Sequence, residues 1–316
     1  MTVTAELRGM ATAGLLAFVL VLLLVSVPTS LPGVELLQSL RFHLAALGIP
    51  LAIILFATRA LWRGLLVVTF MLASAGQGML PLLAGYEARA AVTGETLGEI
   101  EVLSFNVLSG RDGRAAADFI IAQAPDIAVI METPGIERYL DAIAAVLPYR
   151  LGCDVRASCD ISVFSRTPLQ RASMYQMPPY FHERLAVVTT EIDGVPVTVA
   201  GMHLSKPYFD SAAWGELQYA HAVLKSLPGR VILAGDFNAA AWSDQIAGFT
   251  EALDLVPPPG HPATWPVKAG PLGVPIDNMF TRGPLLIEDI AALDDSYGSN
   301  HRALLARISL RAASSP

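Results

Sequence analysis

The chain has 316 residues, of which 53% are hydrophobic and only 16% are charged, and its mean hydropathy is positive. This composition is too apolar for a simple soluble enzyme and favours membrane segments. The net charge is −7, only three Lys occur and no basic stripe is evident, so tight binding to duplex nucleic acid is not expected.

Three charge-free apolar segments account for the excess: residues 9–34, 42–58 and 64–86. Each is close to the roughly 20 residues that a helix needs to cross about 30 Å of hydrocarbon. We therefore predict a membrane region at residues 1–92 with about three transmembrane helices. The middle segment is short and contains Pro50, so a re-entrant hairpin remains an alternative. A signal peptide is the alternative for the first segment, although no convincing cleavage site follows it.

Basic residues indicate the orientation of the membrane region. Arg8 precedes the first segment, and Arg59 and Arg63 lie between the second and the third. Because cytoplasmic loops carry an excess of basic residues, three crossings put the chain after about Tyr86 outside the cytoplasm. The sequence thus predicts a multi-pass membrane protein with an extracytoplasmic domain at residues 98–311.

The two cysteines, Cys153 and Cys159, both belong to this outer domain. A turn could close their spacing into a disulfide in an oxidising compartment. Two thiols without a neighbouring His are a poor metal site, and two buried free thiols remain the alternative.

Beyond a linker at residues 91–97, apolar segments of strand length alternate with segments of helix length. Strands are predicted at residues 101–107, 126–132, 161–165, 185–192, 195–203, 231–238, 276–281, 286–290 and 302–310. Helices are predicted at residues 114–123, 135–146 and 212–226, and from Ser243 onward. The strand, helix, strand order at the start is what parallel pairing requires, and the mixed order of strands and helices predicts a layered α/β sandwich. The Pro-rich residues 257–275 are interpreted as a functional loop or lid.

Polar side chains recur at the ends of these apolar strands. They are Asn106, Glu132, His203, Asp236, Asn238, Asp277 and His301. A single Asp or Asn after a strand is an ordinary turn residue, and a single His is most often a packed strand residue. Several of them at the ends of neighbouring strands would converge, as an active site on an α/β scaffold requires.

Six motifs occur in order across residues 98–311: FNVLSG, IMETPG, GMHLS, AGDFNA, IDN and GSNHRA. In this order and spacing they resemble the endonuclease/exonuclease/phosphatase superfamily, the DNase I-like metal-dependent phosphoesterases. The TWP at residues 264–266 and the apolar N-terminal segments are similar to a bacterial membrane-anchored branch of that family. The resemblance implies a four-layer α/β sandwich with two central sheets, anchored in the bacterial inner (plasma) membrane.

The resemblance also implies a metal site. Glu132, Asn106 and Asn300 correspond to positions at the family's divalent metal ion, and oxygen ligands of this kind suit Mg²⁺ or Mn²⁺. The family usually has Ser-Asp-His where this chain has Ser299, Asn300 and His301. A neutral amide thus replaces a carboxylate, and we expect weaker metal binding.

Catalytic roles follow from the same resemblance. Asp236 corresponds to the residue that orients or deprotonates the attacking water, and Asn238 to a donor to a phosphoryl oxygen. His203 corresponds to a substrate-side histidine that stabilises developing charge when it is protonated. His301 corresponds to a histidine that Asp277 holds in one tautomer.

The sequence therefore predicts a membrane-anchored phosphoesterase in which a divalent metal and a His/Asp pair assist the attack of water on a phosphodiester or phosphomonoester. The rival hypothesis, motivated by Asn300, is a catalytically weakened binding protein for a phosphorylated ligand at the membrane surface. A phosphoester substrate and the membrane are the expected partners, and no protein partner is predicted. Residues considered for the substrate cleft, without assigned roles, are Arg111, Arg114, Lys206, Tyr208 and Trp265. Asn278, where members of the family often have Asp-His, is interpreted as a change in packing.

Overall fold

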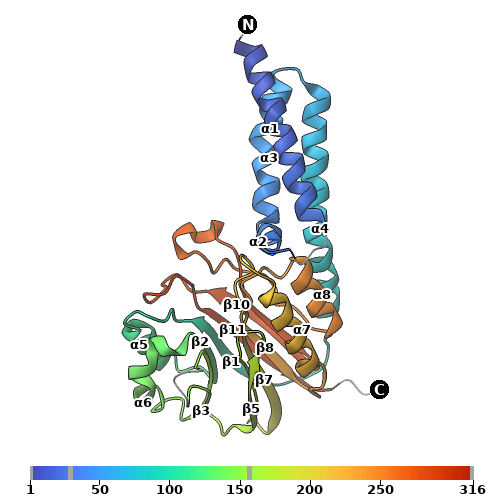
Figure 1. The fold of residues 1–316 in the computed structure, drawn as a ribbon. Helices are drawn as coiled ribbons and strands as arrows, with labels where there is room; N and C mark the ends of the chain where they lie inside the picture. Colours follow the sequence, from blue (N-terminus) through green and yellow to red (C-terminus); the bar gives the residue numbers. More distant parts are fainter. Residues whose placement is uncertain (1–2, 28–30, 155–158, 314–316) are drawn as a thin grey trace.

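An apolar helical bundle stands on an α/β sandwich (Figure 1). The computed structural model describes residues 3–27, 31–154 and 159–313. Helices α1 (Val3–Ser26), α3 (Arg41–Ala57) and α4 (Leu61–Ala90) form the bundle, and the short α2 (Val34–Ser39) lies at its foot. The predicted fold class, an α/β sandwich preceded by apolar helices, is confirmed.

Within the described residues the strands form two sheets. The first, in the order β10-β11-β1-β2-β4-β3, contains β1 (Thr96–Asn106), β2 (Ile127–Met131), β3 (Tyr149–Leu151), β4 (Ile161–Ser165), β10 (Leu285–Ala292) and β11 (Leu304–Arg311). The second, in the order β5-β6-β7-β8-β9, contains β5 (Gln170–Met177), β6 (His182–Ile192), β7 (Val195–His203), β8 (Val231–Asp236) and β9 (Asp277–Arg282). β1 pairs with β2 in parallel, as predicted, and so does β7 with β8.

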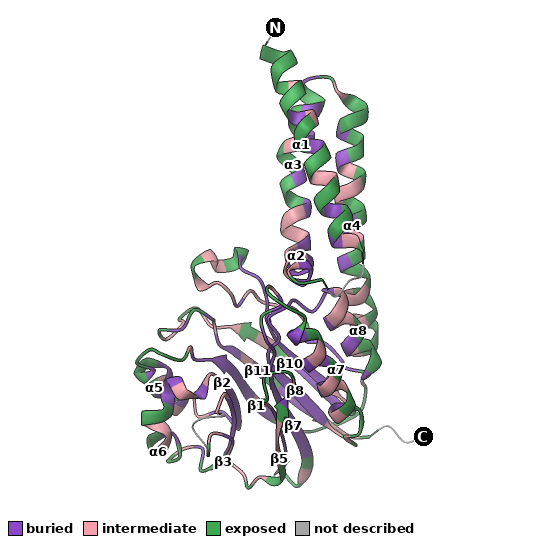
Figure 2. Ribbon diagram, in the orientation of Figure 1, coloured by how far each residue is buried: buried purple, intermediate pink, exposed green. Residues whose placement is uncertain are grey.

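The two sheets pack face to face, and helices cover their outer faces. Side chains such as Val129, Val188 and Val199 form the apolar core between the sheets. α5 (Arg114–Gln123), the 3-10 helix η1 (Thr133–Tyr139) and α6 (Leu140–Ile143) cover the first sheet. α7 (Ala212–Lys225) and α8 (Asp244–Ala252) cover the second, and Figure 2 shows the strands buried between these layers. The result is the four-layer sandwich that the resemblance implied.

Some element boundaries differ from the prediction. The helix predicted at residues 135–146 is η1 followed by the short α6, and Pro134 lies at the start of η1. β3 and β5 were missed, because both are edge strands with exposed residues and depend on pairing with one neighbour. β1 begins inside the predicted linker at residues 91–97, because its first residues pair with β11. The Pro-rich loop contains the 3-10 helix η2 (Val267–Leu272).

The bundle corresponds to the three apolar segments of the sequence. By length and composition α1 and α4 can cross a membrane, whereas α3 has only 17 residues. α1 ends at Ser26 instead of continuing to residue 34, and residues 28–30 lie outside the described part. α3 runs through Pro50 as one helix, which disfavours the re-entrant hairpin. The three helices pack along one narrow seam, and most of their apolar side chains are exposed, Trp62 to 82% (Figure 2).

Buried polar contacts join α2 to the loop that follows β8. The backbone N–H of Ala240 donates to the hydroxyl of Ser39 (2.9 Å), and the indole N–H of Trp242 donates to the Ser39 carbonyl (3.1 Å). Arg41, which is buried at the start of α3, forms a salt bridge with the partly exposed Asp244 (3.2 Å). Unmet polar groups at such a buried interface would be costly, so the foot of the bundle and this loop have one defined relative position.

Glu35 is the buried acid of this interface. Its side chain is 4% exposed and accepts a hydrogen bond from the hydroxyl of Ser243. Burial raises the pKa of Glu35 from 4.5 to about 7, against the effect of the Ser243 hydrogen bond, and the charge of Asp244 adds to the rise. Because the folded value lies above the unfolded one, the stabilising effect of the protonated form is complete below pH 4.5 and is lost as the pH rises through about 7.

We expect Glu35→Gln to remove this pH dependence, since the amide stays neutral. At pH 8 the variant should be more stable than the wild type by on the order of 3 kcal/mol, and below pH 4.5 it should have no advantage. Thermal unfolding of the detergent-solubilised chain between pH 4 and pH 8 measures the stability difference at each pH. Glu191→Gln, at an exposed position of β6, is the control and should follow the wild-type profile. Identical profiles for Glu35→Gln and the wild type would contradict the expectation.

Cys153 and Cys159 form a disulfide, one of the alternatives that the sequence left open. The bond follows β3 and precedes Asp160, which is itself part of the site described below. A disulfide of this kind is typical of proteins that fold in an oxidising compartment.

Candidate active site

The carboxyl ends of several strands meet at one end of the sandwich. Asn106 is the last residue of β1, His203 of β7 and Asp236 of β8. His203 lies opposite Asp236 across β7 and β8, and Asp236 lies opposite Asp277 across β8 and β9. Strand pairing therefore brings together side chains that lie far apart in the sequence.

The backbone at the end of β8 requires particular residues. Gly235 has a φ of 153°, and a Cβ atom there would lie 1.8 Å from the carbonyl oxygen of Met202, so only glycine fits. Asn238 has a φ of 50°, and its backbone N–H donates to the carboxylate of Asp236 (2.8 Å). The amide of Asn238 donates to the carbonyl of Leu204 (2.8 Å). These contacts fix the direction in which Asp236 points.

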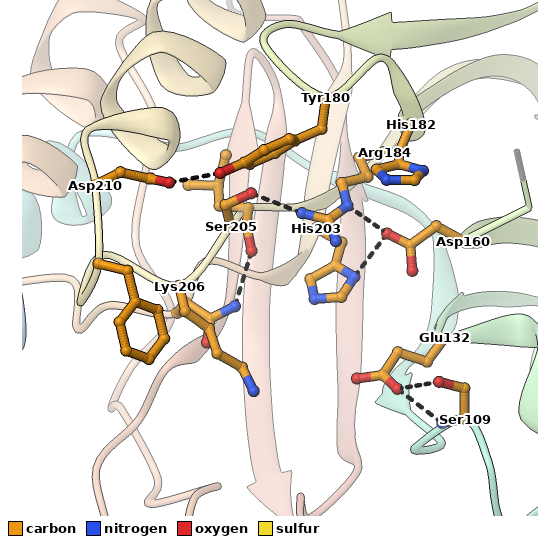
Figure 3. Close-up of a pocket in the computed structure, with 13 residues that line it drawn as sticks. Ser109, Glu132, Asp160, Tyr180, His182, Arg184, His203, Ser205, Lys206 and Asp210 are labelled. Atoms are coloured by element: carbon orange, nitrogen blue, oxygen red, sulfur yellow. Dashed lines mark hydrogen bonds and ion pairs between the residues drawn. The ribbon is translucent and has the colours of Figure 1, made fainter.

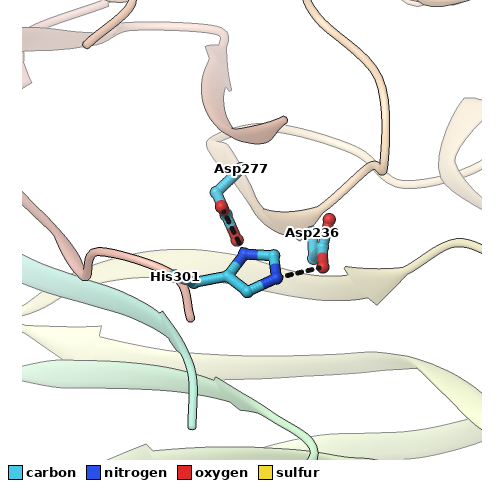
Figure 4. A group of neighbouring side chains, drawn as sticks. All are labelled: Asp236, Asp277 and His301. Carbon is cyan, nitrogen blue, oxygen red and sulfur yellow. Dashed lines mark hydrogen bonds and ion pairs between the residues drawn. The ribbon is translucent and has the colours of Figure 1, made fainter. Parts of the chain in front are cut away.

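Asp236 lies between two imidazoles, each of which is held by a further carboxylate. Its Oδ2 atom is 3.8 Å from Nε2 of His301 and 3.8 Å from Nε2 of His203. Nδ1 of His301 donates to Asp277 (2.9 Å), as Figure 4 shows. Nδ1 of His203 donates to Asp160 (2.9 Å), as Figure 3 shows. Two oriented histidines thus turn their Nε2 atoms toward one buried carboxylate.

These contacts shift the pKa values of the cluster. Burial opposes the charged form of His301, but the charges of Asp277 and Asp236 outweigh it and raise the pKa of His301 to about 9. Burial likewise opposes the charged form of His203, and the charge and hydrogen bond of Asp160 outweigh it and raise its pKa. Burial and the charge of Asp277 raise the pKa of Asp236. At neutral pH the cluster therefore favours a protonated His301 beside an Asp236 of increased basicity.

A charged network behind His203 was missed by the sequence reasoning. Arg184 forms a salt bridge with Asp160 (2.8 Å) and donates to the hydroxyl of Ser205 (2.8 Å). The backbone N–H and the hydroxyl of Ser205 donate in turn to the buried Glu216, at 2.6 and 2.8 Å. These residues are not at the carboxyl ends of apolar strands, and only Ser205 belongs to one of the motifs, GMHLS.

Glu132 follows β2 and stands across the pocket from this network (Figure 3). Its φ of 55° is uncommon for a residue other than glycine. Ser109 donates to its carboxylate through both its backbone N–H and its hydroxyl, at 2.7 Å each. Burial opposes ionisation, but the hydrogen bonds of Ser109 and the charge of His203 outweigh it and lower the pKa of Glu132. An ionised carboxylate therefore faces the pocket at neutral pH.

The donor set around Glu132 fits a hard divalent cation. Asn106 donates through Nδ2 to Asp236 (3.1 Å), and its Oδ1 accepts from the backbone N–H of Leu108 (3.1 Å). That oxygen keeps a second lone pair for a cation. Carboxylate and amide oxygens of this kind suit Mg²⁺ or Mn²⁺ better than they suit softer metals.

The balance of acidic and basic side chains at the site leads to the same conclusion. The acidic ones outnumber the basic ones even with both imidazoles protonated: Glu132, Asp160, Asp236, Asp277 and Glu216 against Arg184, His203 and His301. A divalent cation offsets such an excess. Ligand atoms of Asp236, Asp277 and His301 lie within 4.8 Å of one another and form a second possible donor group. There, however, the hydrogen bond between Asp277 and His301 already occupies two of the atoms.

Asn300 is the predicted metal-site residue that the structure does not join to the others. It is exposed, its carbonyl accepts from the N–H of Val267 (3.2 Å), and within the described residues no hydrogen bond of its side chain is found. Its neighbour Ser299 is buried and donates to the carbonyl of Asn106 (2.6 Å). The buried Asn278 donates to the carbonyl of Ile276, just before β9, and to that of Ala239 in the loop after β8, which agrees with its interpretation as a packing residue.

A pocket of about 520 Å³ opens in front of this cluster (Figure 3). It is lined by Ser109, Glu132, Asp160, Tyr180, His182, Arg184, His203, Leu204, Ser205, Lys206, Phe209, Asp210 and Asn238. Of the residues considered from sequence for the cleft, Lys206 lines the pocket, whereas Arg111, Arg114, Tyr208 and Trp265 are not part of its lining. A volume of this size suits a small polar molecule or the head of a larger one.

A buried acid, two oriented histidines and a hard-cation donor set define a class of protein, the hydrolases that direct water onto an anionic ester. The model of the Endonuclease/Exonuclease/phosphatase family matches residues 103–301, more than half of the chain, and the chain belongs to this family. Its members are phosphoester hydrolases that depend on a divalent metal, so the protein is a phosphoric ester hydrolase. The alternative of a weakened binding protein is not favoured. None of the curated proteins matches the sequence.

Solved structures share the fold at low sequence identity. An endonuclease/exonuclease/phosphatase from Beutenbergia cavernae has a TM-score of 0.56 and 18% identity, over 68% of this chain and 72% of that one. The mannosyl-6-phosphatase Bt3783 of Bacteroides thetaiotaomicron has a TM-score of 0.55 and 14% identity, over 66% and 99%. A beta toxin mutant from Staphylococcus aureus with bound magnesium ions has a TM-score of 0.51 and 15% identity, over 66% and 99%.

The pairing of His301 with Asp277 can be tested without turnover. Asp277→Asn removes the charge that favours the imidazolium, and we expect the pKa of His301 to fall from about 9 by about one to three pH units. An NMR titration of the imidazole in the chelator-treated, detergent-solubilised chain measures the value. The control Asp254→Asn changes an exposed carboxylate after α8 and should leave it unchanged. A pKa of His301 that is unaffected by Asp277→Asn would show that the pair does not set its protonation.

Proposed function

We propose that the protein is a membrane-anchored phosphoesterase that hydrolyses a phosphodiester or phosphomonoester with the help of Mg²⁺ or Mn²⁺. Residues 1–92 form the membrane region and residues 98–311 the catalytic domain. The observation that carries this proposal is the placement of the Asp236 carboxylate between Nε2 of His203 and Nε2 of His301, with the ionised Glu132 across the same pocket.

In this proposal Glu132 and Asn106 would hold the metal ion, and the exposed amide of Asn300 would offer a further oxygen. The bound ion supplies Lewis acidity that neutralises phosphate charge. Ser109 keeps Glu132 ionised and oriented through its two hydrogen bonds. With an amide at residue 300 in place of a carboxylate, the site holds its metal less tightly than it would with Asp.

The remaining residues act on water and on the phosphoryl group. Asp236 orients the attacking water and accepts its proton, a role that its raised pKa supports. His301, held by Asp277, and His203 donate from Nε2 to the oxygens on which negative charge develops. Asn238 uses one amide N–H for the carbonyl of Leu204 and has the other for a phosphoryl oxygen.

The apolar bundle supports the proposed anchoring. α1 and α4 have the length and hydropathy of spanning helices, and most of their apolar side chains are exposed, which a core helix of a soluble protein would avoid. The N-terminal end of α1 and the turn between α3 and α4 lie at the end of the bundle far from the sandwich. The disulfide between Cys153 and Cys159 suits an oxidising compartment and supports an extracytoplasmic catalytic domain at the bacterial inner membrane.

Turnover by the purified full chain tests the chemistry. With Mg²⁺ or Mn²⁺ the detergent-solubilised protein should hydrolyse bis-p-nitrophenyl phosphate or p-nitrophenyl phosphate, and chelation should abolish turnover until metal is restored. Glu132→Ala and His301→Ala should each lower kcat on the order of 100-fold or more. Glu191→Ala, on an exposed part of β6, should retain wild-type kcat. Wild-type turnover in both site variants would refute the assignment.

Membrane insertion has its own test. The full chain expressed in a bacterium should remain with the membranes after extraction at high pH, because the exposed apolar surfaces of α1 and α4 favour hydrocarbon. Protease added to intact spheroplasts should digest the sandwich and leave the turn at Arg59 protected. Release of the protein by high pH would rule out the anchor. Protection of the sandwich from the protease would show that the orientation is the opposite one.

A further inference from the structure

Two loops join the active site to the foot of the bundle. Residues 205–211 follow β7 and line the pocket through Ser205 and Lys206, and in the same loop the carbonyl of Pro207 accepts from the N–H of Gly33 (2.7 Å). In the loop that contains η2, the N–H of Val267 donates to the carbonyl of Asn300, the residue before His301. The active-site end of the sandwich is therefore the end on which the bundle stands (Figure 1).

The second loop also reaches the bundle itself. The carbonyl of Leu272, at the end of η2, accepts from Nε2 of His43 in α3 (3.0 Å). In Figure 1 this orange loop projects beside the foot of the bundle, on the same side of the sandwich as α2. If the bundle spans a membrane, both loops lie at the membrane surface. The pocket then lies in the sandwich, close to that surface.

Large apolar side chains are exposed on the segments around the pocket. Phe209, in the first loop, is 83% exposed, and Leu272 is 75% exposed. Phe181, in the turn between β5 and β6, is 61% exposed, and its neighbour Tyr180 donates to Asp210 of the first loop (2.5 Å). The three side chains come from three separate segments, and each segment borders the active site or contacts the bundle. Exposed apolar groups on segments that border the site or contact the bundle mark a surface that meets an apolar partner.

The pocket offers a cation to a headgroup that enters from this surface. Lys206 is exposed at the pocket wall and has no ion pair within the part of the chain that the structure describes. The charge of Arg184, by contrast, is already balanced by Asp160 and Glu216. A phosphate group between Lys206 and the proposed metal would have a positive charge on each side.

From these observations we infer that the substrate is the phosphoester headgroup of a lipid in the same membrane, which enters the pocket from the bilayer surface while Phe181, Phe209 and Leu272 contact the lipid. The inference rests on the proposed function. Water supplies the oxygen that bonds to phosphorus, one phosphorus–oxygen ester bond breaks, and the proton of the water ends on the leaving oxygen. Both the lipid and the enzyme stay in one bilayer, so the substrate does not have to leave it.

The test uses the full chain reconstituted with Mg²⁺ or Mn²⁺ in phosphatidylcholine vesicles that contain phosphatidylethanolamine, phosphatidylglycerol or phosphatidic acid. Phosphorus-31 NMR follows the conversion of each lipid, and bis-p-nitrophenyl phosphate reports turnover of a soluble ester in the same vesicles. The variant is Phe181→Ser combined with Leu272→Ser, since neither residue lines the pocket. The control is Tyr149→Ser, which removes an aromatic side chain, 40% exposed, from the edge strand β3.

We expect the wild type to convert one of the lipids, the double variant to convert it about tenfold more slowly with unchanged soluble turnover, and the control to match the wild type on both. Soluble turnover without conversion of any of the lipids would overturn the inference and leave the proposed function intact. If the double variant converted the lipid and the soluble ester more slowly by the same factor, the inference would also be overturned. The two side chains would then stabilise the fold and not bind lipid. Absence of turnover of the soluble ester by the wild type would instead refute the proposed function.

Discussion

The carboxylate of Asp236, buried between the Nε2 atoms of two histidines, is the constraint on which the rest of the site depends. A buried carboxylate is costly, and here Asp160 and Asp277 add two more negative charges next to the imidazoles. Protonation of the histidines offsets part of this charge, and the donor set at Glu132 provides a place for a cation to offset more. In the proposed mechanism, the same arrangement gives Asp236 the basicity to accept a proton from water and gives His301 a proton to donate.

The helical region is also joined to the catalytic end of the sandwich. Its foot is joined by hydrogen bonds and a salt bridge to the loop after β8, a few residues beyond Asp236 and Asn238. The loops that border the site touch the bundle at Gly33 and at His43. The catalytic end of the sandwich is thereby fixed next to the apolar helices. A phosphoesterase whose pocket is held at that place acts most readily on an ester that lies beside the bundle.

Sequence reasoning found the residues that end apolar strands, because a hydrophobic run followed by Asp, Asn, Glu or His is a local pattern. It also found the parallel β1–β2 unit and the apolar helices, which depend on hydropathy and on element order. It missed the edge strands β3 and β5, which carry no apolar alternation of their own. It also missed Arg184 and Glu216, because each has its role only through contacts made in three dimensions.

The sequence by itself determined the family, the layered α/β class and the identity of most side chains at the site, since each of these is encoded in local motifs and their order. Only the tertiary structure decided how those side chains meet. Strand register set His203 beside Asp236 and Asp236 beside Asp277, and sheet packing brought in Asp160 and left Asn300 at the surface. The docking of α2 on the loop after β8 was likewise invisible in the sequence, because a buried polar contact between residues some 200 positions apart leaves no periodic pattern in either segment.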